Sequence, residues 1–321
     1  MTPPVTRRVV LAVATGMLAA TATARAQNAP ADLVALRLAS SPADDTMPVL
    51  YAQQTGAFRR AGLDVQLTRA TSGSAVAAAV AGGSVDIGKS SIVSIVTARA
   101  KGVPFVWIAP ASMYNPASPD GGLIVATNSP IKTARDLNGK IVAVPALGDL
   151  NAVATRAWID QNGGDSKSIQ FVEVPVTAQA AALDEGRIAA GGIINPFLGE
   201  AMTSGKARLL GPFYSAIANK FMLSGWFTTV DFAAKHRDAV ASFQRIVDTA
   251  STYTNAHHLE TAPLLASWTG ITLDQAAHFP RMTNGARIAA QDIQPVIELL
   301  AKYAVIPKAF DAREMIVEPA R

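Results

Sequence analysis

Residues 138–175 form the stretch that most constrains the fold of this chain. Residues 141–144 are a short apolar run, partly β-branched, which is typical of a strand covered on both faces. Pro145 ends that run, because proline cannot donate to a strand ladder. The sequence then predicts a helix over 151–161 and another strand over 171–174. This strand–loop–helix–strand order indicates a parallel sheet flanked by helices.

The loop 145–151 is a candidate site for an anionic or polar ligand. Parallel sheets present their ligand sites at the carboxyl ends of the strands, where helix N-termini offer free N–H groups. Asp149 or Asn151 can cap the helix that follows. An ordinary connection that binds nothing is the alternative, and for a single loop it is the favoured one.

The same pattern recurs on both sides of this unit. Strands are predicted at 35–39, 63–67, 85–88, 103–108, 123–126, 191–194, 209–210 and 225–229, and helices at 48–62, 75–81, 92–100, 178–185, 231–255, 258–268, 272–279 and 286–302. The sequence therefore predicts an α/β fold of two lobes, each a mostly parallel sheet flanked by helices. We expect residues 33–121 plus 222–310 in lobe 1 and 122–221 in lobe 2, with crossings near 119–122 and 212–223.

The composition limits the classes of function. Half of the 321 residues are hydrophobic, 16% are charged and none is cysteine, so disulfides, cysteine-ligated metals and cysteine nucleophiles are excluded. Residues 1–26 are predicted to be a signal peptide: Arg7-Arg8 precede an apolar stretch, and Ala24-Arg25-Ala26 suits cleavage. The pair of arginines leaves the Sec and twin-arginine routes open. Without this segment the 28 basic residues fall to 25 against 24 acidic, and nothing suggests nucleic-acid binding.

Several motifs in order resemble one family. They read TGAFRRAGLDVQL, SGSAVAAAVAGGSVDIGKSS, ARDLNGKIVAVPALGDLNAVATRAWIDQNGG and AALDEGRIAAGGIINPF. Over roughly residues 36–300 the chain resembles the solute-binding proteins of ABC importers, in the sulfonate/nitrate/taurine-binding and NMT1/THI5-like group. The resemblance implies a type 2 periplasmic-binding-protein fold, the two-lobed "Venus flytrap", with a ligand cleft between the lobes.

The resemblance also implies which residues meet the ligand. They lie in loops that match the family's contact loops, and are Ser41, Asp44, Asp45, Gly73, Ser74, Ser90, Ser91, Leu147, Gly148, Asn151, Asn195, Ser224 and Trp226. Asn195 stands where many relatives have Glu, which puts a carboxylate role there in doubt. No arginine lies in a predicted contact loop, so a bidentate clamp on an anion is not evident.

Several of these residues, and the neighbouring Lys89, also have a structural interpretation. Ser90 and Ser91 either donate to a ligand or cap the helix at 92. For Lys89 a solvated side chain is favoured over an anion partner. Asp44 and Asp45 either receive a cationic group or cap the helix near residue 47, and capping is favoured for one of them. Trp226 either stacks on a ligand or belongs to the core, with the core favoured.

We expect a binding protein and not an enzyme. The predicted role is the extracytoplasmic, periplasmic component of an ABC importer, a monomer that takes a small organic anion such as a sulfonate or carboxylate. Its partners would be the permease and ATPase subunits, and no cofactor, metal, or nucleic acid is expected. The alternatives are a THI5-like binder of a pyrimidine precursor, a related enzyme, or an extracytoplasmic sensor. The enzymes of that group rely on a cysteine-rich segment, which this chain lacks.

Overall fold

The computed structural model describes residue 1 and residues 33–117, 120–195 and 197–317. All helices and strands given below lie in the compact unit Leu33–Arg321. The predicted signal peptide, 1–26, lies outside the described residues apart from residue 1. In the described part of the chain, no helix combines the length and the apolar character needed to cross a membrane.

The larger sheet has six strands in the order β11-β4-β10-β3-β1-β2. Their bounds are Val34–Ser40 (β1), Leu63–Arg69 (β2), Ile87–Ser91 (β3), Phe105–Met113 (β4), Met222–Thr229 (β10) and Thr283–Asn284 (β11). β1 pairs in parallel with β2 and β3, whereas β10 runs antiparallel between β3 and β4. β10 thus returns from far along the chain to join two segments of the N-terminal half.

The second sheet has five strands in the order β7-β6-β8-β5-β9. Their bounds are Gly121–Ala126 (β5), Ile141–Val144 (β6), Gln170–Glu173 (β7), Ala190–Ile194 (β8) and Ala207–Gly211 (β9). β6 pairs in parallel with β7 and β8, and β5 runs antiparallel to β8 and β9. The predicted α/β class with two sheets is confirmed, while the residue limits of the two lobes stay a prediction.

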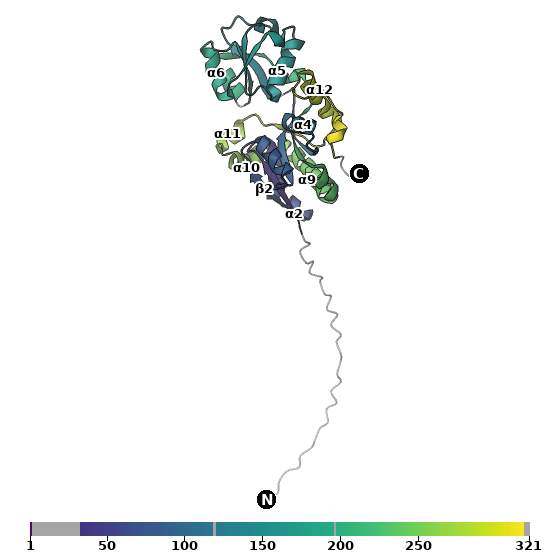
Figure 1. Cartoon of the computed structure of the whole chain (residues 1–321). Helices are drawn as coiled ribbons and strands as arrows, with labels where there is room; N and C mark the ends of the chain where they lie inside the picture. Colours follow the sequence, from purple (N-terminus) through teal and green to yellow (C-terminus); the bar gives the residue numbers. More distant parts are fainter. Residues whose placement is uncertain (2–32, 118–119, 196, 318–321) are drawn as a thin grey trace. The chain divides into compact units, whose positions relative to one another are not determined.

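Twelve α-helices are present in the described residues. Their bounds are Met47–Gln54 (α1), Ala57–Arg60 (α2), Gly73–Ala81 (α3), Ile92–Ala100 (α4), Leu150–Gln161 (α5), Val176–Asp184 (α6), Phe197–Thr203 (α7), Val230–Lys235 (α8), Arg237–Ala256 (α9), His258–Thr269 (α10), Leu273–His278 (α11) and Gln294–Lys302 (α12). Figure 1 shows α5 and α6, in teal, beside the second sheet.

Side-chain caps explain several helix starts. Ser72, Ser91 and Asp149 accept from backbone N–H groups in the first turns of α3, α4 and α5. Each cap supplies an acceptor for an N–H that has no partner inside its helix. The predicted cap at Asp149 and the capping interpretation of Ser91 are therefore confirmed. Neither Asp44 nor Asp45 caps α1, whose N-cap is Thr46 without a side-chain bond, so that interpretation was wrong.

Several predicted boundaries were also wrong. β3 continues to Ser91, so Lys89 and Ser90 lie within the strand because β10 pairs with them. β4 runs through Pro110 to Met113 beside a register shift in its pairing with β10. The helix predicted over 231–255 is interrupted at His236, and the one predicted from residue 286 begins at Gln294.

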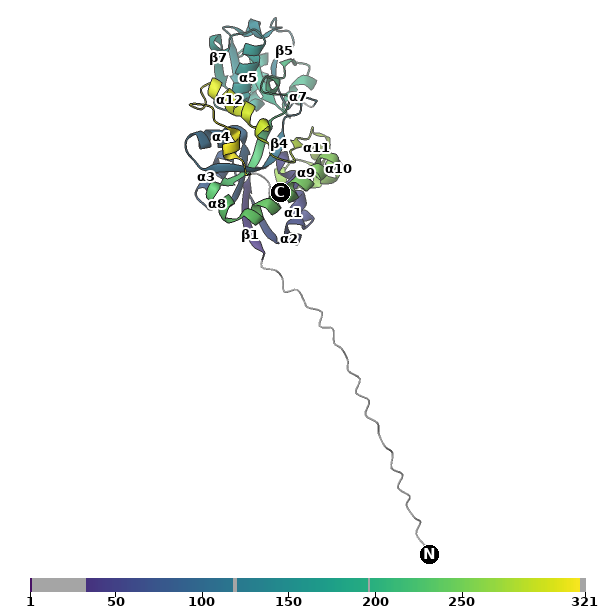
Figure 2. The ribbon, with the colours of Figure 1, turned by 90° about the vertical axis from the view of Figure 1, so that its right-hand side faces the viewer.

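The C-terminal helix α12 connects elements of the two sheets. It contacts α4, which follows β3, and α5, which follows β6. In Figure 2, α12 is the yellow helix beside α4 and α5. Its buried Val296, Ile297 and Leu300 share one hydrophobic cluster with Val153 and Ile95. The Tyr303 hydroxyl, just beyond α12, donates to Asp160 Oδ2 of α5 at 2.7 Å.

Gly88 provides a test of the packing under β3. A Cβ there would lie 2.5 Å from Val76 Cγ1 and 2.8 Å from both Val80 Cγ2 and Phe227 Cζ. We expect Gly88→Ala to destabilise the fold by about 1–3 kcal/mol, because neighbouring side chains must shift in a packed core. The matched control is Gly148→Ala, where a Cβ meets nothing within 4 Å. Urea unfolding measures both; equal stabilities of the two variants would contradict this packing.

Candidate ligand-binding site

A cavity of about 810 Å³ is lined by residues from both sheets and their helices. Such a volume lies within the range of roughly 300–1,000 Å³ that small-molecule sites occupy. The structure brings together seven of the predicted contact residues at its wall: Asp44, Asp45, Ser91, Gly148, Asn151, Asn195 and Ser224. Asn151 and Asn195 come from the segments that follow β6 and β8, and Ser224 lies on β10.

The other predicted contact residues do not line this cavity. They are Ser41, Gly73, Ser74, Ser90, Leu147 and Trp226. Trp226 is fully buried and packs against Phe243 of α9, with ring centroids 5.7 Å apart. The core interpretation of Trp226 is the one that the structure supports. Ser90 is buried against Gly73, where an added Cβ would lie 2.4 Å from the Ser90 hydroxyl.

Some lining residues were missed by the sequence analysis. They are chiefly Ser94, Ser112, Asp120, Tyr214 and Arg281. Asp149, which belongs to the predicted ligand loop, also lines the cavity. Ser94 follows Ser91 by three residues at the start of a helix, so it carried a usable signal. Asp120 lay in the predicted crossing between lobes. Nothing local marked Arg281, because its segment reaches the cavity only through tertiary packing.

A buried ion pair lies behind one wall of the cavity. Lys89 Nζ pairs with Asp45 Oδ1, and these residues are only 3% and 4% exposed. Ser224 donates to Asp45 Oδ2, and Ser112 and Ser224 share a hydrogen bond of 2.7 Å. The interpretation of Lys89 as a solvated residue was wrong, because Asp45 holds its charge inside the protein. Four segments thus meet in one polar network.

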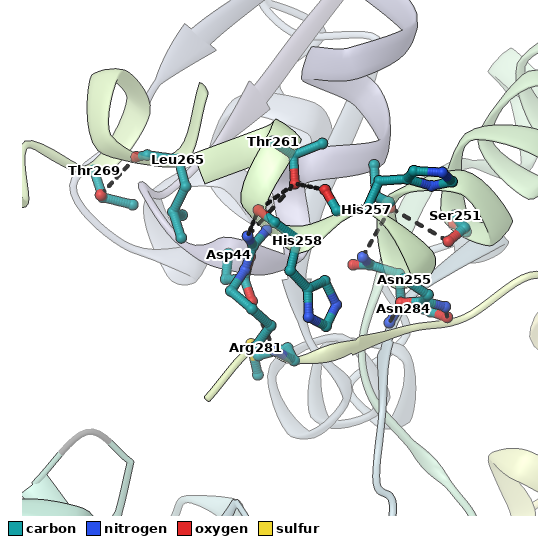
Figure 3. A network of polar contacts seen from close by, with 12 residues as sticks. Asp44, Ser251, Asn255, His257, His258, Thr261, Leu265, Thr269, Arg281 and Asn284 are labelled. Carbon is teal, nitrogen blue, oxygen red and sulfur yellow. Dashed lines mark hydrogen bonds and ion pairs between the residues drawn. The ribbon is translucent and has the colours of Figure 1, made fainter. Parts of the chain in front are cut away.

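A second ion pair joins Asp44 to Arg281. Arg281 Nε and Nη2 both lie 2.7 Å from Asp44 Oδ1, and the Met282 N–H donates to Asp44 Oδ2 at 2.7 Å. Arg281 Nη1 donates to the carbonyl of His258 at 3.2 Å, as Figure 3 shows. Burial raises the pKa of Asp44, an effect that Arg281 opposes. This pair fixes the segment after α11 against the start of α1.

Two further carboxyl groups have no cationic partner among the described residues. Asp149 accepts from the Ala152 N–H at 2.8 Å, and burial raises its pKa to about 6. Burial also raises the pKa of Asp120 to about 6, and the negative charge of Asp44 adds to this effect. Within the described part of the chain, the Asp120 carboxyl makes no hydrogen bond or ion pair. Charge on either group is therefore costly.

An amide and a phenol complete this side of the cavity. The Tyr214 hydroxyl donates to Asn151 Oδ1, and Asn151 is 7% exposed. Burial raises the pKa of Tyr214, and the negative charges of Asp149 and Asp120 add to that effect. The Asn151 Nδ2 group donates no hydrogen bond to any described residue. It is therefore available to a ligand oxygen.

A comparison with known proteins identifies the family to which this chain belongs. The family described as NMT1/THI5 like matches residues 43–260. The chain belongs to the NMT1/THI5-like family. A putative aliphatic sulfonates-binding protein of Escherichia coli (strain K12) is 27% identical over 256 residues, which is 74% of this NMT1/THI5-like chain and 75% of the relative.

The solved structure of a sulphonate-binding protein has the same fold as this chain. The crystal structure of the periplasmic aliphatic sulphonate binding protein SsuA from Escherichia coli matches with a TM-score of 0.73 at 23% identity, over 88% of this chain and 97% of that one. The predicted two-lobed fold of periplasmic binding proteins is thereby confirmed. A 4-amino-5-hydroxymethyl-2-methylpyrimidine phosphate synthase of Schizosaccharomyces pombe is 31% identical over 94 residues, 29% of this chain and 26% of that protein.

The part of the chain that the structure describes has no cluster of side chains suited to a metal ion. Among the described residues, no group of three or more His, Asp or Glu side chains stands close enough together to hold one. His257 and His258 do not line the cavity, and burial together with the positive charge of Arg281 lowers the pKa of His258. The chemistry that this cavity offers is hydrogen bonding, charge and apolar contact.

The Lys89–Asp45 pair yields a stability prediction. Lys89→Met leaves the Asp45 charge buried without its partner, so we expect a loss of about 3–5 kcal/mol in the free energy of unfolding. The double variant Lys89→Met with Asp45→Leu should regain most of that loss. Lys206→Met is the matched control, because its pair with Asp184 is exposed and worth roughly 0–1 kcal/mol. Equal losses for the two single lysine variants would contradict the buried pairing.

The raised pKa of Asp120 predicts a dependence of stability on pH. Because its folded-state pKa, about 6, exceeds the ordinary 3.8, the folded state binds the proton more tightly, and stability falls as pH rises through this window. We expect Asp120→Asn to have a higher Tm than the unaltered protein at pH 7 and a flatter Tm profile between the two pKa values. Asp231→Asn, on the surface of α8, is the control. An unchanged slope for Asp120→Asn would show that this carboxyl is solvated.

Proposed function

We propose that this chain is the extracytoplasmic solute-binding component of an ABC importer. The observation that carries the proposal is the cavity whose polar groups come from both sheets. A binding protein of this kind needs convergent donors and acceptors and two lobes that close on the solute, and it needs no nucleophile or general base. The family and the sulfonate-binding names of its relatives support the same role.

The first ligand class to consider is a small organic anion, a sulfonate or a carboxylate. Ser91 and Ser94 line the cavity at the N-terminus of α4, where the helix dipole favours negative charge. The unpaired Asn151 amide at the start of α5 adds a donor from the opposite sheet. The cavity is far larger than an ion such as nitrate needs, which supports an organic solute.

The same proposal includes the cellular location of the chain, the roles of its lobes and its partners. Residues 1–26 would direct export to the periplasm, and lobes 33–121 plus 222–310 and 122–221 would close around the solute. A monomer would then deliver it to the permease and ATPase subunits. The alternative is binding or conversion of a pyrimidine precursor, to which the partial likeness to the pyrimidine phosphate synthase points. The absence of cysteine favours binding over the enzyme activity of that group.

A thermal-shift panel tests the proposal. Sulfonates, carboxylates, nitrate, pyrimidines and amines are offered singly to the full chain. A ligand that binds only the native state stabilises it by about 2.7 kcal/mol at a hundredfold excess over Kd, which raises Tm by a few degrees in a protein of this size.

Asn151→Ala supplies the matched variant for that panel. This variant removes the free amide from the cavity, so the rise in Tm that an active compound produces should be smaller. Gln291→Ala, outside the cavity, is the control and should show the full rise in Tm. A panel in which no class of compound raises Tm would overturn solute binding as the function. Turnover of a pyrimidine by the purified chain would favour the enzyme.

A further inference from the structure

More acidic than basic side chains line the cavity. Four carboxyl side chains line it, Asp44, Asp45, Asp120 and Asp149, and among the described residues Arg281 is the one cationic side chain that does so. Lys89 lies behind the wall and not on it. This balance is unexpected for a site that would hold an anion by charge alone.

The two cationic side chains at or near the cavity, Arg281 and Lys89, already have partners within the protein. All three guanidinium nitrogens of Arg281 are engaged: two contact Asp44 Oδ1, and Nη1 donates to the His258 carbonyl. Its side chain is 3% exposed, so it is held in place on every side. Lys89 is likewise enclosed with Asp45. A ligand anion could recruit either cation only by displacing a buried carboxylate.

Asp120 and Asp149 remain without a cation. Both line the cavity, as does Tyr214, and both stand at one edge of the second sheet. Asp120 directly precedes β5, which is antiparallel to β8, and Asp149 follows β6, which is parallel to β8. Asp149 accepts from the first turn of α5 through Oδ1, whereas the Asp120 carboxyl has no partner within the described residues. Two partly buried carboxylates without a counter-charge are unfavourable until a cation or a proton reaches them.

Most of the remaining wall is apolar. Val93, Leu150, Ile194, Leu223, Leu265 and Phe279 are among the residues that supply it. A hydrated inorganic cation would leave these side chains unused, whereas an organic body would bury them together with its own apolar surface. The wall therefore favours a solute with both an apolar body and a charged group.

We infer that the solute carries a protonated amine on an apolar body, with its ammonium group held between Asp120 and Asp149. The inference rests on the proposed function and narrows its ligand. An ammonium donates three hydrogen bonds and supplies the charge that both carboxylates lack. A sulfonate or carboxylate elsewhere on the same solute is compatible with this arrangement, but an anion alone leaves the two acidic groups unpaired.

The test uses compounds that differ only in the head group. Benzylamine, benzyl alcohol and phenylmethanesulfonate are compared by calorimetry with the full chain, together with hexylamine, hexan-1-ol and hexane-1-sulfonate. We expect each amine to bind at least about tenfold more tightly than its alcohol and its sulfonate. Asp120→Asn and Asp149→Asn should each reduce that preference by about tenfold and leave the alcohols unchanged, whereas the exposed Asp231→Asn keeps it.

The variants separate binding from folding. Asparagine retains the capping acceptor at position 149, and the Tm without ligand reports any loss of fold. Tighter binding of the sulfonates than of the amines would overturn this inference and leave solute binding intact. An amine preference that survives in both variants would also overturn it. Failure of every compound in the broader panel is the separate result that overturns the function itself.

Discussion

The ion pair between Asp45 and Lys89 is the interaction on which this side of the cavity depends. It joins the segment after β1 to the centre of β3, and Ser224 and Ser112 extend it to β10 and β4. These segments are separated by up to 179 positions in sequence, as the Ser224–Asp45 bond shows. Because a buried charge must keep its partners, the bond from Ser224 to Asp45 favours the return of β10 to its position between β3 and β4. The position of the cavity wall follows from that return.

The helices and strands that were predicted well are those fixed by local chemistry. Val142, Ala143 and Val144 of the run 141–144 are buried, and this strand pairs on both sides. Asp149 caps α5 because its carboxyl follows a break made by Pro145 and Gly148. The strand at Lys89 and Ser90 was missed because polar residues seldom occupy the centre of a sheet. There the pairing with β10, which no local pattern reveals, overrides the preference of the side chains.

The candidate site was partly predictable for the same reason. Asn151 and Ser91 stand at the start of helices after strands, and that position alone places them at the carboxyl edge of a sheet. Arg281 comes from a segment between α11 and β11 whose path depends on its pairing with Asp44. Trp226 shows the opposite case: it follows Ser224 by two residues on β10, yet it is fully buried in the core. The pairing of β10 with β4 shifts register between Ser224 and Gly225, so the regular alternation of faces does not hold there.

The helix α12 has a mechanical consequence. The backbone passes between the two sheets twice, after β4 and after β9. With its contacts to α4 and α5 and the Tyr303–Asp160 bond just beyond its end, α12 supplies a third attachment that does not lie on either crossing. Because α12 packs against one helix from each sheet, any change in the relative position of the two sheets must also alter the contacts of α12 with α4 or α5.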